Sequence, residues 1–349
     1  MLRLKQPALG ILGTAIIMVI SLALISLFTY NVFSGWVAYL LMCLIPMQIG
    51  VAVLWKGNAP LGIPSLRQPW KGLLLVFITV LAGTIVAPSY MAVVGGELGP
   101  TPMLVQCTIV SVVITFWFAI MWGGWPFTSF IRNPVGAGIV TVAASYVVNV
   151  VLFRLFFNYG FMRDAPVYVE SLDPQGLFNG WSALVFYVTA LAVMFLTLHF
   201  DLWPMTKFPK VMTQPVLGLV WTGVVLLLGA ALFVIGTGVL QMDTVTFLVR
   251  IPVPFIFGTI VVLNMLQNSL FASLAQPLKG VANTVAAAIV GVVLAVLYSQ
   301  LAPVVTGSLS SGPPAYESEI WLASALLSVT FPFLIYFAEF LGFWPMKAE

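Results

Sequence analysis

The sequence has 349 residues, of which 61% are hydrophobic and only 7% charged, with a net charge of +3. Soluble globular chains carry about 25% charged residues, so this composition excludes an ordinary soluble enzyme, a disordered chain and a nucleic-acid-binding protein. A spanning helix needs about 20 mainly apolar residues. The composition therefore predicts an all-α integral membrane protein that crosses the lipid bilayer many times, as a single transmembrane domain over 1–349.

Apolar stretches separated by Gly, Pro and charged residues predict ten transmembrane helices. They are expected at about 8–30, 33–55, 70–90, 101–124, 134–157, 180–203, 215–238, 251–268, 277–300 and 319–343. The first stretch has no small-residue cleavage site, so it is predicted to be an uncleaved span rather than a signal peptide. The longest connections, 158–179 and 301–318, contain acidic residues, Pro, Gly and Ser, and we expect them to face water.

The basic residues predict the orientation of the chain. With a cytoplasmic N-terminus, ten of them fall on the cytoplasmic side and three on the other. The ten are Arg3, Lys5, Lys56, Arg67, Lys71, Arg132, Lys207, Lys210, Lys279 and Lys347, and the three are Arg154, Arg163 and Arg250. Because short cytoplasmic loops are enriched in Lys and Arg, both termini are expected in the cytoplasm. The expected location is the plasma membrane, specifically a bacterial inner membrane.

A short sequence motif, Gln-Pro or Asn-Pro and the residues after it, recurs at the cytoplasmic start of every odd-numbered span. We call it the Gln-Pro phrase. Its copies begin at Gln6-Pro7, Gln68-Pro69, Asn133-Pro134, Gln214-Pro215 and Gln276-Pro277. Three even-numbered spans are followed by a Trp-Pro phrase, at Trp125, Trp203 and Trp344, and span 2 keeps a tryptophan alone, at Trp55. We interpret these phrases as five parallel two-helix repeats, at about 6–55, 68–125, 133–203, 214–268 and 276–344.

Each part of the phrase has a local physical reason. Proline is favourable at the start of a helix, where no hydrogen bond is lost. An Asn or Gln before it can offer its side-chain oxygen to free N–H groups of the first turn. Glycine one turn later lets a neighbouring helix approach closely. Tryptophan before proline is expected to anchor the end of a span at the membrane interface.

The fourth repeat lacks Trp-Pro and has Asn264-Met265-Leu266-Gln267-Asn268-Ser269 in its place. Asn264, Gln267 and Asn268 are spaced to share one helical face. A departure from a repeated pattern marks the copy in which a specific function is most expected. These three amides are therefore candidate binding residues.

Ionisable residues inside spans are costly and usually functional, and this sequence has few. His199 and Asp201 lie just before Trp203, and Glu339 lies just before Trp344. With the amides they could line one pocket in the cytoplasmic half, where a histidine and a carboxylate could exchange protons near neutral pH. Alternatively, His199 and Asp201 reach the headgroups, Glu339 pairs with Lys207 or Lys210, and the amides only join helices.

Gln48 is a further candidate, because Pro46 before it can kink span 2 and free a carbonyl group. Chemistry-bearing motifs are otherwise missing from the sequence: it has no phosphate-binding glycine loop, HExxH, CxxC or GxSxG. Its two cysteines, Cys43 and Cys107, lie in apolar stretches, and one histidine cannot build a three-histidine metal site. No catalytic residue, metal or cofactor is therefore predicted.

These observations favour a secondary transporter or permease for a small organic solute, coupled to protons if the polar pocket titrates. The alternative is a non-catalytic membrane subunit that anchors a membrane or periplasmic partner protein, or that binds lipid, quinone or pigment. A third reading is a membrane enzyme acting on lipid, with His199 and Asp201 as acid and base. The sequence does not distinguish the oligomeric state.

Overall fold

The computed structural model describes residues 4–55, 57–60 and 62–347, so Arg3 and Lys56 lie outside the described residues. It is helical apart from two short paired strands, β1 (Phe157–Asn158) and β2 (Phe178–Asn179). Ten of the described helices are long and apolar enough to cross a membrane. The prediction of a multi-pass all-α chain is therefore confirmed at this level.

We number these helices as spans 1 to 10 in chain order. The odd-numbered ones, called outer spans, are α1 (Ala8–Ile25), α4 (Trp70–Val93), α7 (Pro134–Phe156), α9 with η8 (Val216–Val239) and α12 (Leu278–Val305). The even-numbered ones, called inner spans, are α2 to η2 (Tyr30–Leu54), α5 with η4 (Pro102–Met121), α8 (Gly180–His199), α10 to η9 (Thr244–Met265) and α13 to η11 (Glu317–Phe340). Short helices in the connections include η3 (Ile63–Ser65), α6 (Phe127–Phe130), η5 (Gly160–Met162), η6 (Glu170–Leu172) and η7 (Met205–Lys207).

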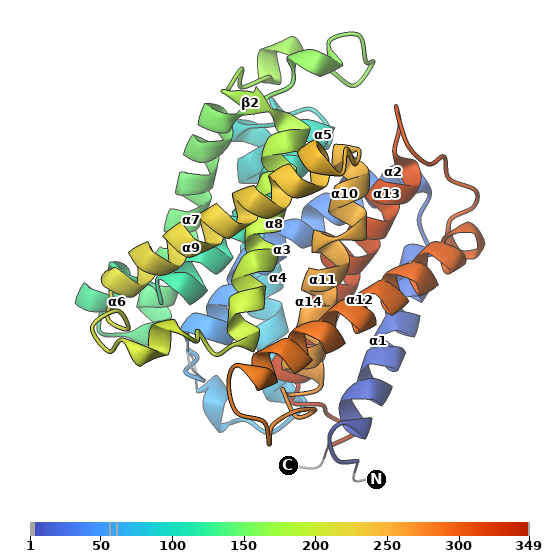
Figure 1. Cartoon of the computed structure of the whole chain (residues 1–349). Coiled ribbons are helices and arrows are strands. Elements are labelled where there is room, and N and C mark those ends of the chain that lie inside the picture. The colour runs from blue at the N-terminus through green and yellow to red at the C-terminus, as the bar shows by residue number, and fades with distance from the viewer. Residues whose placement is uncertain (1–3, 56, 61, 348–349) are drawn as a thin grey trace.

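The inner spans form the core of the molecule. Of the apolar stretch in each inner span, 61% to 78% is buried, against 22% to 44% in the outer spans. Each inner span contacts the next one along the chain, and span 10 closes the circle by contacting span 2. Each outer span lies over the groove between two neighbouring inner spans, as α9 does between spans 4 and 6 and α12 between spans 6 and 8 (Figure 1).

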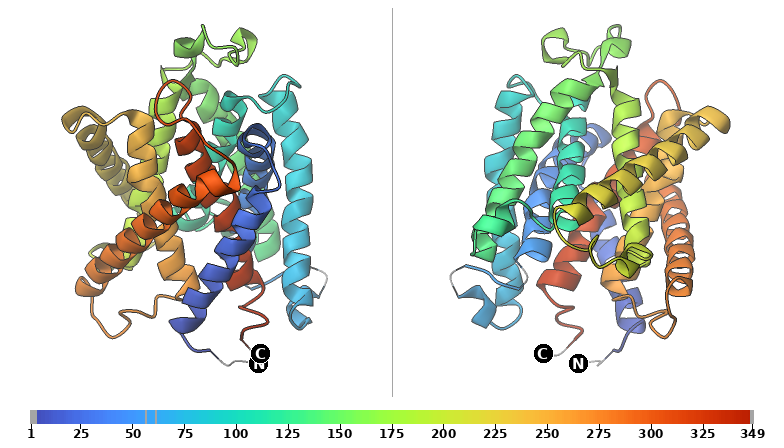
Figure 2. Two further views of the ribbon diagram at one scale, coloured as in Figure 1. Left: turned by 90° about the vertical axis from the view of Figure 1, so that its right-hand side faces the viewer. Right: turned by 60° about the vertical axis from the view of Figure 1, so that its left-hand side comes forward.

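Both ends of the described chain lie at the same end of the molecule (Figure 2). The segment 158–179 lies at the opposite end, beyond the helices. The C-terminal ends of the inner spans face the end that carries the termini. This arrangement fits a chain that crosses the membrane an even number of times.

The Gln-Pro phrases connect outer spans to inner spans. In four of them the glutamine Oε1 accepts the N–H of the glycine four residues later, while its Nε2 donates to the carbonyl that ends an inner span. The accepting carbonyls are Met265 O for Gln6, Phe340 O for Gln68, Met121 O for Gln214 and His199 O for Gln276. Since the first N–H and last C=O groups of a helix have no partner within it, one side chain satisfies the ends of two helices.

The glycine of the phrase makes this junction possible. A Cβ on Gly10 would overlap the Met265 carbonyl, and one on Gly280 would overlap the Phe200 ring. Asn133 has a shorter side chain, and among the described residues it caps its own helix alone, by accepting the N–H groups of Val135 and Gly136. The predicted capping role of Gln and Asn is thus confirmed, whereas the bond to a second helix was not predicted.

A substitution of Gln214 tests this junction. Gln214→Glu keeps an acceptor for the Gly218 N–H but removes the donor to Met121 O, so a carboxylate then faces a carbonyl. We expect the unfolding free energy to fall by about 1–2 kcal/mol, measured by thermal unfolding in detergent. Gln175→Glu, at an exposed loop position, is the matched control. Equal stabilities of the two variants would show that the junction contributes nothing.

Span 8 differs most from its predicted range of 251–268, since it runs from Thr244 to Met265. Asp243 caps its start by accepting the N–H of Thr246 at 2.9 Å. The chain then bends at Ile251, before Pro252 begins α11 (Pro252–Ile260). Arg250, predicted to lie in an outer loop, is therefore inside the span. Trp55, at the end of span 2, is buried against Gly138 of span 5.

Candidate functional site

A cavity of about 220 Å³ lies among the inner spans, near their C-terminal ends. Two layers of its lining each take one residue from every inner span. The layer nearer the span ends contains Val53, Ile120, Leu198, Asn264 and Glu339, and the next contains Ile49, Phe116, Phe195, Ile260 and Ile335. The cavity therefore lies on the common axis of the inner spans, at the end of the molecule that carries the termini.

The polar groups of the cavity come from three inner spans. Asn264 Nδ2 of span 8 donates to Glu339 Oε1 of span 10 at 2.9 Å. Glu339 is exposed and is the only charged residue among the described lining residues. Spans 8 and 10 thus present a carboxylate and an amide together at the mouth of the cavity.

Thr259 of span 8 also lines the cavity, and so does Gln48 of span 2, which lies deeper than Asn264 and Glu339. The Gln48 side chain is only 1% exposed, and its Nε2 donates to Pro332 O at 2.8 Å. Its Oε1 has no hydrogen-bond partner among the described residues. Buried polar atoms are nearly always paired, so this oxygen is an acceptor available to a molecule in the cavity.

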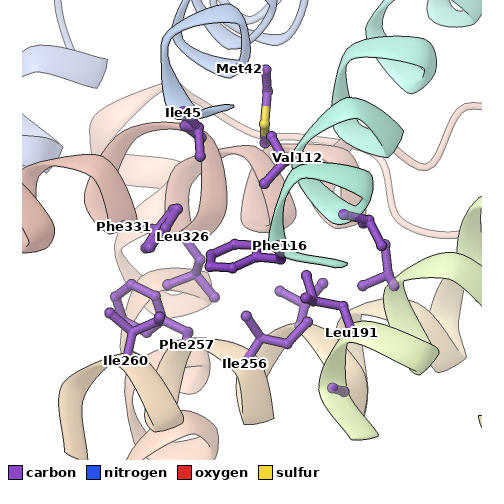
Figure 3. Close-up of a cluster of buried hydrophobic side chains, with 14 of the residues drawn as sticks. Met42, Ile45, Val112, Phe116, Leu191, Ile256, Phe257, Ile260, Leu326 and Phe331 are labelled. Carbon is purple, nitrogen blue, oxygen red and sulfur yellow. The ribbon is translucent and has the colours of Figure 1, made fainter. Parts of the chain in front are cut away.

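Beyond the cavity the axis is closed by apolar side chains. A space of only about 40 Å³ shares Phe116, Phe195, Ile260 and Phe331 with the cavity and is lined only by apolar residues. Figure 3 shows side chains from different helices, among them Ile45, Val112, Leu191 and Ile256, meeting around this space. The rings of Phe116 and Phe195 are 5.2 Å apart, edge to face. We call the side chains that line this smaller space the apolar seal.

His199 and Asp201 are not paired with each other. The His199 side chain is fully buried, and its Nε2 lies 3.0 Å from Thr259 Oγ1, while Thr259 lines the cavity. Asp201 lies outside the helix and accepts hydrogen bonds from Gln276 at 2.8 Å and Lys279 at 2.9 Å. The predicted histidine–carboxylate pair is therefore wrong, because the chain leaves the helix between the two residues and turns Asp201 towards span 9.

The environment of Asp201 makes its ionisation favourable. Partial burial opposes the charged form, but hydrogen bonds from Gln276 and Lys279 outweigh it and hold the pKa of the Asp201 carboxyl below its ordinary value. A depressed folded-state pKa gives stability that is present above the unfolded pKa and is lost as the pH falls through the folded one.

A pH series therefore tests the contact between Asp201 and Lys279. Wild-type protein is expected to lose stability relative to Asp201→Asn as the pH falls below about 4, and to be the more stable of the two at neutral pH. Asp164→Asn, which removes an exposed loop carboxylate, is the control. Melting temperatures between pH 3 and 7 would give the comparison. Parallel curves for wild type and Asp201→Asn would contradict it.

Gln267 and Asn268 do not share a face with Asn264, because span 8 ends at Met265 and both have left-handed backbone angles, with φ of 51° and 52°. Gln267 is exposed, and Asn268 Oδ1 accepts from Asn283 Nδ2 at 2.7 Å. Left-handed pairs also follow spans 4, 6 and 10, at Gly123-Gly124, Asp201-Leu202 and Gly342-Phe343. The fourth unit therefore keeps the same turn with different residues.

Of the seven candidate residues, the structure brings Gln48, Asn264 and Glu339 to one cavity. His199 lies behind its wall, and Asp201, Gln267 and Asn268 lie outside it. No ion pair joins Glu339 to Lys207 or Lys210 in the described part of the chain. Thr259 and the phenylalanines at the cavity floor were not predicted, because nothing in their local sequence distinguishes them from other core residues.

The described residues contain no group of three or more His, Cys, Asp or Glu side chains that could hold a metal ion. Cys43 and Cys107 are buried free thiols. Comparisons of the chain with protein-family models, with curated proteins and with solved structures found no match.

Proposed function

We propose that the chain is a secondary transporter or permease for a small organic solute, which binds in the cavity among the inner spans. The observation that carries this proposal is a polar-mouthed cavity on the common axis, built by all five inner spans and closed beyond by the apolar seal. A path closed at one end suits a carrier that alternates between two states better than a permanently open pore.

We further propose that the chain consists of five parallel two-helix repeats around this axis. Two observations support it: the inner spans contact one another in a closed ring, and each outer span packs against two neighbouring inner spans. The four equivalent glutamine bonds add support from side chains. Under this proposal the axis is a pseudo-fivefold axis along the membrane normal.

The orientation belongs to the same proposal, with the end that carries the termini in the cytoplasm of a bacterial cell. The excess of basic residues assigned to that side supports it. The cavity would then open to the cytoplasm, and the segment 158–179 would lie outside.

We propose that proton coupling acts through Glu339. It is the one carboxylate among the described lining residues of the cavity. His199 is buried and hydrogen-bonded to Thr259, and Asp201 accepts a hydrogen bond from Lys279. A histidine–carboxylate relay is therefore not part of the proposal.

Reconstitution into liposomes tests the transport proposal. We expect proteoliposomes to take up at least one member of a panel of cationic, neutral and anionic solutes of similar small size faster than protein-free liposomes. The uptake should saturate with concentration. Uptake of every solute at the protein-free rate would overturn the proposal.

The alternative, a membrane subunit that binds lipid or quinone, has one observation in its favour. A groove of about 470 Å³ between α4 and α7 is lined almost wholly by apolar side chains, among them Val86, Val147 and Val151. It suits an acyl or isoprenoid tail. Mass spectrometry of protein purified in mild detergent would favour this alternative if a stoichiometric lipid, quinone or partner protein accompanied an inactive chain.

A further inference from the structure

The lining of the cavity includes hydrogen-bond acceptors that a bound molecule could satisfy. One N–H of the Gln48 amide donates to Pro332 O, and one N–H of the Asn264 amide donates to Glu339. The acceptors open to a bound molecule include the unpartnered Gln48 Oε1 and the Glu339 carboxylate. A ligand that satisfies them must bring hydrogen-bond donors.

The ionisable side chain in the cavity lining also favours a ligand that brings hydrogen-bond donors. The lining includes the carboxyl group of Glu339, and no Lys or Arg is among the described residues that line the cavity. An anion would meet an uncompensated carboxylate, whereas a cation would form charge-assisted hydrogen bonds with it. A neutral hydrogen-bond donor would form weaker bonds with the carboxylate than a cation does.

The rest of the wall is apolar. Ile49, Val53, Leu198 and Ile335 line the sides, and the rings of Phe116 and Phe195 close the inner end. Such a surface suits the hydrocarbon part of a solute and gives nothing to a hydrated inorganic ion. The volume of about 220 Å³ limits the solute to a small molecule.

We propose that this cavity selects small organic cations, with the cationic donor group at Glu339 and Gln48 and the apolar body against the aliphatic and aromatic wall. This inference rests on the proposed function in taking the cavity as the solute site. Binding can be measured without transport, so the two can fail separately.

Three probes of similar shape test the charge requirement: butylguanidinium, butylurea and butyrate. Butylguanidinium stays charged at all usable pH values, and butylurea is its neutral analogue with similar donors. Binding to the full chain in detergent, by calorimetry at constant ionic strength, is expected to be at least about tenfold tighter for butylguanidinium than for butylurea. Butyrate is expected not to bind.

Two variants assign this preference to the cavity. In Glu339→Gln an amide oxygen can still accept from Asn264, so the fold is expected to remain, while the preference for butylguanidinium over butylurea should fall to about unity. Gln48→Leu should weaken both donor-bearing probes. Glu97→Gln removes an exposed carboxylate from a loop outside the cavity and should change neither affinity.

Tighter binding of butylurea or butyrate would overturn the inference, as would an unchanged preference in Glu339→Gln or displacement of butylguanidinium by low concentrations of sodium chloride. Binding of butylguanidinium without any flux would refute transport but keep this inference. Saturable flux of neutral or anionic solutes that is insensitive to Glu339→Gln would refute this inference but keep transport.

Discussion

Gly291→Ala is expected to lower the unfolding free energy by about 2–3 kcal/mol. A Cβ at Gly291 of span 9 would overlap the backbone carbonyl of Pro254 in span 8, and a Cβ at Gly258 would overlap the carbonyl of Ala287. Because backbone rather than a flexible side chain stands in the way, the two helices must separate. The consequence is a loss of packing between α11 and α12.

Thermal unfolding in detergent, followed by tryptophan fluorescence, measures this effect. Gly223→Ala in α9 is the matched control, since a Cβ there meets nothing within 4 Å. Its stability should equal that of wild type or exceed it by up to about 1 kcal/mol, because alanine lowers the entropy of the unfolded chain. A Gly291→Ala protein as stable as the control would show that spans 8 and 9 do not pack as closely as described.

The second large effect is expected for Glu339→Gln in transport. One carboxylate can hold a proton or a cation but not both at full affinity, so an outward proton gradient should drive uptake of butylguanidinium into proteoliposomes. Removing the charge should reduce this gradient-driven uptake by at least about tenfold. The assay is accumulation with and without an imposed pH gradient.

Asp201→Asn is the control for that experiment. Asp201 lies outside the cavity and contacts Gln276 and Lys279, so its replacement should leave the gradient dependence intact. Equal loss in both variants would place the effect outside the cavity. Unchanged gradient-driven uptake in Glu339→Gln would remove Glu339 from the coupling.

Much of the fold could be predicted from hydrophobicity and helix-end residues. The spans follow from apolar length, and the capping by Gln6 or Gln214 follows from a polar side chain before proline. The second bond of each glutamine could not be predicted, because its acceptor, such as Met121 O for Gln214, lies far away in the sequence. The start of span 8 was missed because Arg250 and Pro252 suggest a boundary, whereas Asp243 caps the helix earlier.

The candidate site was predictable only in part. Asn264 and Glu339 stand at the same depth in spans 8 and 10, and helical spacing from the span ends was enough to suggest that they meet. The expectation that His199 and Asp201 meet in one pocket failed because the helix ends at His199, and the turn after it carries Asp201 towards Lys279 of span 9. The prediction that Gln267 and Asn268 share a helical face with Asn264 failed for the same reason, because span 8 ends at Met265.

The transport proposal depends on a cavity that opens at the end that carries the termini and is closed beyond by the apolar seal. Leu198 and Leu191 test it as a pair on one helix, since Leu198 lines the cavity and Leu191 lies in the seal. Single cysteines would be placed at each position in protein with Cys43 and Cys107 replaced by alanine, and then exposed to a membrane-impermeant cationic thiol reagent. We predict rapid labelling of Leu198→Cys from the cytoplasmic side only, with Leu191→Cys protected from both sides. Labelling of Leu191→Cys as fast as Leu198→Cys, or labelling of Leu198→Cys only from outside, would contradict the account.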